Sequence, residues 1–313
     1  MSEQTNNTDQ SFSFDELPDA PPKRKIKLSW PGKIGIAIVL FWSVIVVIGP
    51  SISPYHEADI LDEDIFIVPG SDEIYPETEF QPPSNIVYLG SDYIGRDLLS
   101  RILYGARTTI GISVLATLLA YLIGVTAGIA ASVGSRYLDM VLSRVNDALL
   151  SIPSIMFALV LIAALNSPGI FWLILITGFI YATSVFRIAR SLGQEVMVSD
   201  FVEAAKVRGE GLWWIITREI LPNIAMPLAT DFGLRFVWVI LFISSLSFLG
   251  LGVQPPMSDW GSMVKENLPG LVLGSYAPLM PAFAIASLTI SVNMIVDDIS
   301  AATGGKLAKR MIS

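Results

Sequence analysis

The sequence predicts an all-α integral membrane protein with six transmembrane helices, and two observations carry this prediction. Hydrophobic residues make up 52% of the 313 residues and charged residues only 15%, whereas soluble domains contain about 25% charged residues. The apolar residues also gather in long uncharged blocks. A helix needs about 20 such residues to cross the hydrocarbon core of a bilayer.

Five uncharged or nearly uncharged blocks account for the six crossings. The block over 148–186 is too long for one crossing, and the turn sequence NSPG at 166–169 divides it into two helices. The tail over 1–30 is polar and is expected to be largely disordered. No small-residue cleavage site follows the first block, so that helix is expected to stay. The other four blocks lie over 34–52, 108–133, 224–252 and 275–296.

The distribution of Lys and Arg predicts the orientation, because cytoplasmic loops are enriched in these residues. With six crossings, fifteen of the twenty basic residues fall on one side, four fall on the other, and Arg235 lies inside the fifth helix. Both termini are therefore expected in the cytoplasm. The expected regions are a cytoplasmic tail over 1–30, a first helix over 31–52, an external loop over 53–107, a core of five helices over 108–298 with a cytoplasmic loop over 187–223, and a cytoplasmic tail over 299–313.

A charged stretch broken by glycines lies in the long cytoplasmic loop. It reads DFVEAAKVRGEGLWWIITREILPN over 200–223. Asp200 with Glu203 three residues later resembles a capping box, so a short helix is predicted to begin here. Gly209 and Gly211 are predicted to stop it. A second helical pattern follows and is expected to end at Pro222, so that the two helices lie along the membrane surface.

The first of these helices carries two adjacent small residues, Ala204 and Ala205. Their narrow profile would suit a groove on another protein, with Glu203, Lys206 and Arg208 fixing the register. The alternative is an amphipathic helix at the membrane interface with nothing docked on it. The residues alone leave both interpretations open.

The order E-A-A, three residues, G and a spacer ending in I-L-P-N resembles the EAA loop of ABC-importer permeases. The segments LGSDYIGRDLLSRILYGART (89–108) and LSFLGLGVQPPMSDWG (246–261) resemble the C-type subunit of the dipeptide, oligopeptide and nickel subfamily. The resemblance extends over 89–296 and implies the type I ABC importer permease architecture. The ATPase-coupling loop that it implies comprises Asp200, Glu203, Ala204, Ala205, Arg208, Gly209, Glu219, Leu221, Pro222 and Asn223.

Two residues of this loop depart from the family pattern. Glu219 stands where many relatives carry His, and Arg208 stands where an apolar residue is common. Both changes alter the charge of a surface that the resemblance assigns to docking.

The resemblance implies a non-catalytic permease subunit of an ATP-driven importer in a prokaryotic plasma membrane. Peptides come ahead of nickel, opines and oligosaccharides as its substrate. Its expected partners are a homologous second permease, two cytoplasmic ATPases, an external substrate-binding protein and membrane lipid, without nucleic acid. ATP and Mg²⁺ would bind to the ATPases, since this chain lacks the sequence G-x-x-x-x-G-K-[ST]. The single histidine, His56, is expected to be a solvated loop residue and provides no metal site.

Asp231 and Arg235 lie four residues apart inside the fifth helix. Ionisable groups are costly there, so the two residues form either a gate or a structural ion pair. They are also the candidate groups for the alternative function, an ion-coupled secondary transporter, although the sequence shows no internal repeat.

A second charged group precedes the second helix and contains residues at helical spacing. We expect exposed ion pairs that stabilise the start of the helix, rather than contacts to a substrate. The residues concerned are Asp92, Arg96, Asp97 and Arg101.

Overall fold

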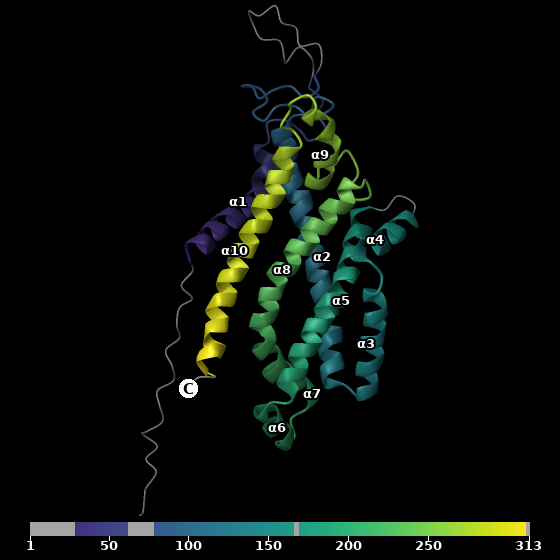
Figure 1. The fold of residues 1–313 in the computed structure, drawn as a ribbon, viewed down its shortest axis with the longest axis vertical. Helices are drawn as coiled ribbons and strands as arrows, with labels where there is room; N and C mark the ends of the chain where they lie inside the picture. The colour runs from purple at the N-terminus through teal and green to yellow at the C-terminus, as the bar shows by residue number, and fades with distance from the viewer. Residues whose placement is uncertain (1–28, 62–77, 166–168, 311–313) are drawn as a thin grey trace, which may run out of the picture.

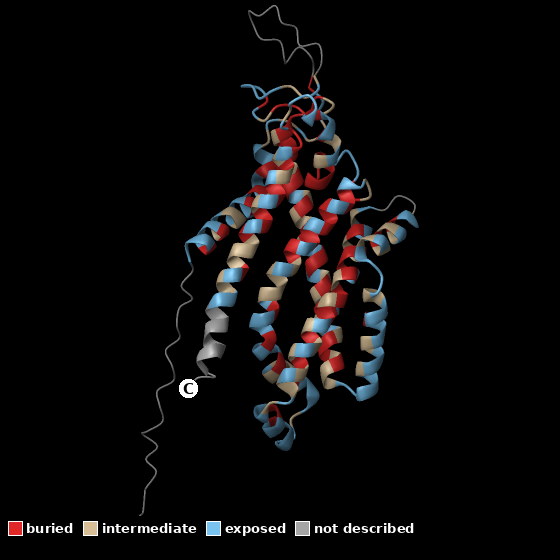
Figure 2. Ribbon diagram, viewed as in Figure 1, coloured by how far each residue is buried: buried red, intermediate tan, exposed pale blue. Residues whose placement is uncertain are grey.

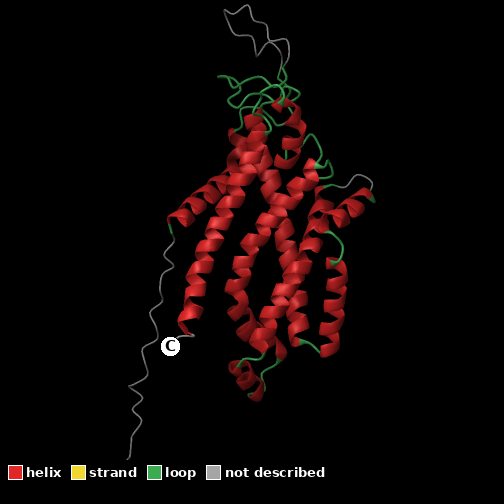
Figure 3. Cartoon of the chain, viewed as in Figure 1, coloured by secondary structure: helices red, strands yellow, loops and turns green. Residues whose placement is uncertain are grey.

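The computed structural model describes residues 29–61, 78–165 and 169–310, and over these ranges it contains helices and loops but no β-strand (Figures 1 and 3). Residues 1–28 of the N-terminal tail, predicted to be disordered, and residues 166–168 of the turn predicted at 166–169 fall outside these ranges. The helices are α1 (Trp30–Ile52), α2 (Leu98–Val133), α3 (Arg136–Leu150), α4 (Ser154–Ala163), α5 (Ile170–Met197), α6 (Asp200–Val207), α7 (Leu212–Trp214), the π-helix η3 (Ile215–Ile220), α8 (Leu221–Phe248), α9 (Trp260–Asn267), the 3-10 helix η4 (Leu268–Leu271) and α10 (Leu279–Arg310).

Five helices of the described chain are long and apolar enough to cross a membrane: α1, α2, α5, the continuous helix Leu212–Phe248, and α10. The pair α3 and α4, bent by 83°, gives the sixth when the two pieces are counted as one crossing. The sequence placed this crossing from residue 148 onward. Instead a helix begins at Arg136, breaks after Leu150, and resumes beyond Pro153, because proline lacks the N–H that would continue the ladder.

The helix α2 packs closely along α5 through small residues. A methyl group on Gly124 would lie 2.6 Å from Val185 Cβ, and one on Gly128 would lie 2.8 Å from Ala189 Cβ. Small residues allow this approach, because dispersion contacts drive helix packing in lipid. The sequence suggests the same packing role for Gly111, but nothing within the described chain lies within 4 Å of a methyl group at that position. Figure 2 shows the buried residues as stripes along α2, α5 and α8.

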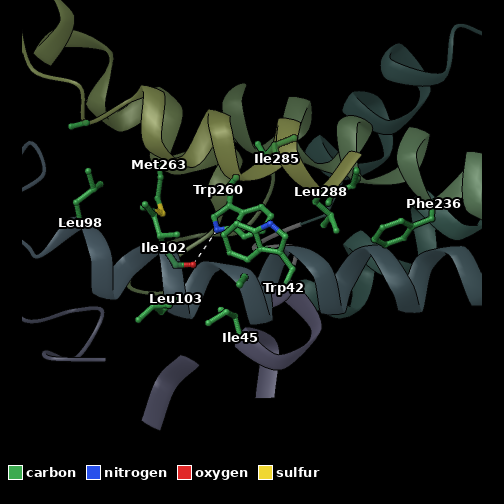
Figure 4. Packing of buried hydrophobic residues seen from close by; sticks show 14 residues of the cluster. Trp42, Ile45, Leu98, Ile102, Leu103, Phe236, Trp260, Met263, Ile285 and Leu288 are labelled. Carbon is green, nitrogen blue, oxygen red and sulfur yellow. Dashed lines mark hydrogen bonds between the residues drawn. The ribbon is translucent and has the colours of Figure 1, made fainter. Parts of the chain in front are cut away.

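A second core joins α1, α2, α8, α9 and α10 around two tryptophans (Figure 4). The rings of Trp42 and Trp260 meet edge to face with centroids 4.7 Å apart. Each indole N–H has a partner: Trp42 Nε1 donates to Ser287 Oγ at 3.0 Å and Trp260 Nε1 donates to the Ile102 carbonyl at 3.1 Å. These satisfied polar ends let two large rings be buried without an unpaired donor.

Two helices extend beyond their apolar blocks. The helix α2 begins at Leu98, ten residues before the predicted start, because Asp97 caps it by accepting a hydrogen bond from Ser100 N at 2.7 Å. At the other end of the chain, α10 continues to Arg310 through the region expected to be a tail. Hydropathy reports only the part of a helix that lies in lipid.

Candidate functional site

The short helix α6 lies at one end of the molecule, beyond the ends of α5 and α8 (Figure 1). It begins where predicted, but the capping box does not form. Ser199 occupies the N-cap position, and its hydroxyl donates to the Glu195 carbonyl rather than accepting from α6. Asp200 and Glu203 lie inside the first turn, where the helix dipole favours negative charge.

Gly209 ends α6 as predicted. It has a φ of +84°, which side chains with a Cβ rarely adopt. Its N–H donates to the Lys206 carbonyl at 3.0 Å, and the next N–H, that of Glu210, donates to the Ala205 carbonyl at 3.1 Å. This pair of hydrogen bonds is the Schellman motif, which satisfies the last carbonyls of a helix.

One face of α6 packs into its own chain. Val202 and Ala205 are fully buried. The cluster that holds them draws residues from α2, α5, η3 and α8, namely Ile129, Ala189, Ile215, Ile220, Ile224 and Leu228. The interpretation of Ala205 as part of an outward narrow profile is therefore wrong: its small size is required inside the molecule, where a larger side chain would overpack the cluster.

The opposite face of α6 is exposed and includes Ala204. We call this face, together with the segment that follows, the α6 surface; its exposed residues are Asp200, Phe201, Glu203, Ala204, Lys206, Val207, Arg208, Gly209, Gly211, Leu212 and Trp213. Val207 and Trp213 are 83% and 76% exposed. The guanidinium of Arg208 lies over the ring of Trp214, 5.8 Å from its centroid. The α6 surface thus combines apolar side chains with charges of both signs.

The second helix of the loop does not end at Pro222. The segments α7, η3 and α8 form one continuous helix, and Pro222 lies in the first turn of α8. The N–H of Leu221 donates five residues back to Ile216, so a π-turn precedes the proline. The wider turn lets the ring follow without a break. Asn223 Nδ2 donates to the Glu219 carbonyl at 2.7 Å.

This continuity also corrects the predicted arrangement along the membrane surface. Only α6 is a separate helix, since residues 212–221 are the beginning of the fifth crossing. The two parts of the predicted coupling loop nevertheless meet, because Ile220 packs in the same cluster as Val202 and Ala205.

Asp231 and Arg235 form the predicted ion pair, with Arg235 Nη2 3.1 Å from Asp231 Oδ1. Their third partner is Tyr121 of α2, whose hydroxyl donates to the other carboxylate oxygen; no local pattern in the sequence indicates this contact. The nitrogen Nε of Arg235 is buried and has no hydrogen-bond acceptor in the described part of the chain. The group therefore ties α8 to α2.

The charged group before α2 is buried rather than exposed, which contradicts our expectation. Asp92 pairs with Arg96 at 2.7 Å and with Arg101 at 2.5 Å, and Glu266 of α9 contacts both arginines at 3.2 and 2.9 Å. The side chain of Arg101 is only 1% exposed. Asp97 does not pair with Arg101 but caps α2. The network fastens the loop before α2 to α9, which supports a structural role.

Two buried carboxyl groups begin helices at this end of the molecule. Asp97 caps α2, and Asp259 caps α9 by accepting from Ser262 N at 3.0 Å while Thr109 Oγ1 donates to it at 2.8 Å. Burial raises the pKa of both carboxyl groups above the ordinary value of 3.8. Sequence reasoning missed Asp259, although an Asp three residues before Ser262 is typical of an N-cap.

The carboxylates and the single histidine of the described ranges do not gather into a group of three that would hold a metal ion. His56 is exposed, as predicted, and its ring lies 5.3 Å from that of Tyr104.

The fold and this surface define a class: a polytopic all-α membrane protein with a short exposed helix fastened to the ends of its crossings. The chain belongs to the family of binding-protein-dependent transport system inner membrane components, whose family model matches residues 120–303. The EAA-like segment, the group of Tyr121, Asp231 and Arg235, and every crossing after α2 lie within this match, which begins partway along α2.

Curated relatives agree with the family. The chain is 33% identical over 235 residues to the dipeptide transport system permease protein DppC of Alkalihalophilus pseudofirmus, covering 75% of this chain and 77% of the relative. It is 31% identical over 225 residues to the glutathione transport system permease protein GsiD of Pectobacterium atrosepticum, covering 72% and 74%. It is 30% identical over 292 residues to DppC of Bacillus subtilis, covering 91% and 85%.

The chain is accordingly a permease component of a transport system that depends on a binding protein, and it is not the subunit that hydrolyses ATP. The alternative of an ion-coupled secondary transporter finds no support among these relatives.

Proposed function

We propose that this chain is the permease subunit of an ATP-driven importer of di- or oligopeptides, and that the α6 surface couples it to cytoplasmic ATPases. The observation that carries the proposal is the α6 surface itself. It presents the EAA-like residues Glu203 and Ala204 at an exposed end of the molecule. Dipeptide and glutathione permeases among the relatives favour peptides as the substrate class.

The proposed complex contains a second, homologous permease, two ATPases that bind ATP and Mg²⁺, and an external substrate-binding protein. The excess of basic residues on the side of α6 favours a cytoplasmic location for this helix and for both termini. The docking contact includes Arg208 and Glu219, the two residues that depart from the family pattern. Their charges would be matched by opposite charges on the cognate ATPase.

The buried face of α6 explains how docking would move the permease. Val202 and Ala205 pack against residues of α2, α5 and α8, among them Ile129, Ala189 and Ile224. Close-packed interfaces of this kind transmit displacement, because they are hard to compress. Closure of the two ATPases would therefore shift three crossings together, and the binding energy of ATP would bias the permease between two conformations.

The test uses two neighbouring alanines that face opposite ways. Ala204→Trp places a bulky side chain on the exposed face, so the permease should reach the membrane and pair with its partner permease, but ATPase subunits should no longer co-purify. Ala204→Ser is the matched control and should retain them. Ala205→Trp should instead lower the amount of folded permease, because the ring enters the buried cluster.

The measurements are the recovery of ATPase subunits and the hydrolysis stimulated by loaded binding protein in reconstituted complexes. Normal values for Ala204→Trp would contradict docking through α6 and would leave it as a helix that only covers the ends of the crossings.

A further inference from the structure

A polar cavity lies between α3 and α5 on the part of the molecule toward α6, and nothing described so far uses it. It has a volume of about 640 Å³, which is within the range of about 300–1,000 Å³ for small-molecule sites. Phe186 and Met140 form the apolar part of the cavity wall, and the other lining residues are polar or charged. Charged groups along membrane helices face water-filled cavities or each other, and the exposed side chains of Arg144, Asp147 and Arg187 lie at this cavity.

One ion pair in the cavity is already satisfied. Arg190 Nη2 lies 2.7 Å from Asp139 Oδ2, and Arg190 Nε contacts the other carboxylate oxygen. Three charged side chains remain. Arg144, Arg187 and Asp147 line the cavity and are exposed. None of the three forms an ion pair with a residue that the structure describes. The cavity thus offers two cations and one anion to a ligand.

Asn146 supplies an independent observation that points to a ligand. It lines the cavity and is only 6% exposed, yet its amide nitrogen Nδ2 has no hydrogen-bond acceptor within the described ranges. An unsatisfied buried donor is costly, and it is unusual enough in a folded protein to need an explanation. A ligand oxygen entering the cavity would satisfy it.

We propose that this cavity binds the charged end groups of a short zwitterionic peptide. Arg144, Arg187 and the Asn146 amide hold its carboxylate, and Asp147 holds its ammonium group. Guanidinium groups bind carboxylates through charge-assisted hydrogen bonds. This proposal rests on the proposed function, peptide import. It adds a site in the permease that receives the peptide after the binding protein has released it.

The carboxylate of Asp147 favours a zwitterionic ligand over an anionic lipid headgroup. A phosphodiester would gain from the two arginines but would be repelled by Asp147, whose charge also acts on Arg190. A free peptide has an ammonium group for the aspartate and a carboxylate that the two arginines can share.

The test uses the absence of cysteine from the chain. Ser143→Cys places one thiol on the cavity lining with almost no change in shape. The complete transporter is reconstituted, treated with a small water-soluble maleimide, and the mass of this subunit is followed. Alanyl-alanine at millimolar concentration should slow the labelling. N-acetyl-alanyl-alanine amide, which has a similar shape but no charge, should not.

Adding Asn146→Leu or Arg187→Gln to this protein should raise the concentration of alanyl-alanine needed for protection about tenfold, since each removes a charge-assisted or buried hydrogen bond. Arg136→Gln, on the same helix but outside the cavity lining, is the matched control and should leave protection unchanged.

Import of alanyl-alanine by the same complex is measured in parallel. Import without protection would overturn the cavity proposal alone, whereas protection without import would support the cavity and contradict the transport assignment. Labelling that slows only in vesicles containing phosphatidylglycerol, and not with the peptide, would identify a lipid site and overturn the proposal. A thiol that stays unlabelled in the assembled complex would do the same, because a partner chain then closes the cavity.

Discussion

Gly209 and Gly211 lie two residues apart after α6, but only the first needs to be glycine. Gly209 has a φ of +84°, whereas Gly211 has a φ of −76°, and nothing lies within 4 Å of a methyl group at either position. The two sites therefore differ in backbone conformation and not in available space. A comparison of the two isolates the conformational requirement at the end of α6.

Gly209→Ala should loosen α6 by about 1 kcal/mol, because alanine disfavours the left-handed conformation of the Schellman motif. Trypsin cuts after Lys206 and Arg208, and cleavage follows the population of the locally opened state. We expect cleavage of the purified permease to be about fivefold faster in Gly209→Ala. Gly211→Ala should be cleaved at the wild-type rate, and equal rates for both variants would contradict this account.

The buried carboxyl group of Asp259 gives the stability of the permease a pH dependence. Burial raises its pKa above 3.8, and that of Asp97 in the same way. The folded state then holds these protons more tightly than the unfolded chain does. The resulting stabilisation is complete below the unfolded pKa and is lost as the pH rises through the raised folded pKa.

The free energy of unfolding contributed by Asp259 should therefore fall as the pH rises from about 4 toward neutrality. Asp259→Asn should flatten this decline, because asparagine also caps helices and carries no charge. Thermal unfolding of the detergent-purified protein across this range measures it. Asp200→Asn, on the exposed α6, is the control, and an identical slope in wild type and Asp259→Asn would show that Asp259 does not titrate there.

At the scale of helices, the group of Tyr121, Asp231 and Arg235 links α2 to α8. Asp231 accepts from Tyr121 and pairs with Arg235, whereas Arg235 pairs only with Asp231 among the side chains described. The two charges are therefore not equivalent. Loss of the aspartate leaves a partly buried cation without a partner, but loss of the arginine leaves the aspartate with its tyrosine.

Asp231→Asn should destabilise the permease by about 2 kcal/mol, less than the ~3–5 kcal/mol typical of a fully buried ion pair, because the two side chains are partly buried. Arg235→Gln should cost less, and the double variant should be more stable than Asp231→Asn. Thermal unfolding midpoints of the purified proteins compare the three. Additive effects of the two substitutions would mean that the groups are hydrated and do not interact.

The crossings were predictable because hydrophobic length is a local property of the sequence. Two helix boundaries were predicted wrongly, each for a reason that lies in the local sequence. The sequence favoured a helix end at Pro222, but a π-turn at Ile216 and Leu221 lets the helix pass through. It favoured a new helix after residue 148, but α3 begins at Arg136 among charged residues, where hydropathy carries no signal.

The candidate site was predictable in position but not in orientation. The EAA-like motif predicted the position of α6. Its pattern did not indicate whether Ala204 or Ala205 would face the interior. Ala205 is buried only because Ile129, Ala189 and Ile224 come from three distant segments. The buried network shows the same limit: Arg101 pairs with Glu266, which is 165 residues away, and no local spacing indicates such a partner.

At the scale of the whole molecule, the orientation in the membrane rests on the distribution of basic residues, and the cysteine-free chain allows a direct test. Val272 is 90% exposed in the loop after α9, and Tyr137 is 74% exposed at the start of α3. We expect a membrane-impermeant maleimide to modify Val272→Cys on intact cells, but to modify Tyr137→Cys only after permeabilisation. The opposite pattern would reverse the orientation.

The unbroken helix over 212–248 has a mechanical consequence. Its 37 residues span roughly 55 Å, and Figure 1 shows α8 running from α6 at one end of the molecule toward α9 at the other. In the docking that we propose, this continuous helix would carry a displacement applied at α6 toward the end near α9, so the two ends of the permease would move together. The π-turn at Ile215–Ile220 and Pro227 are the places where the helix would bend first.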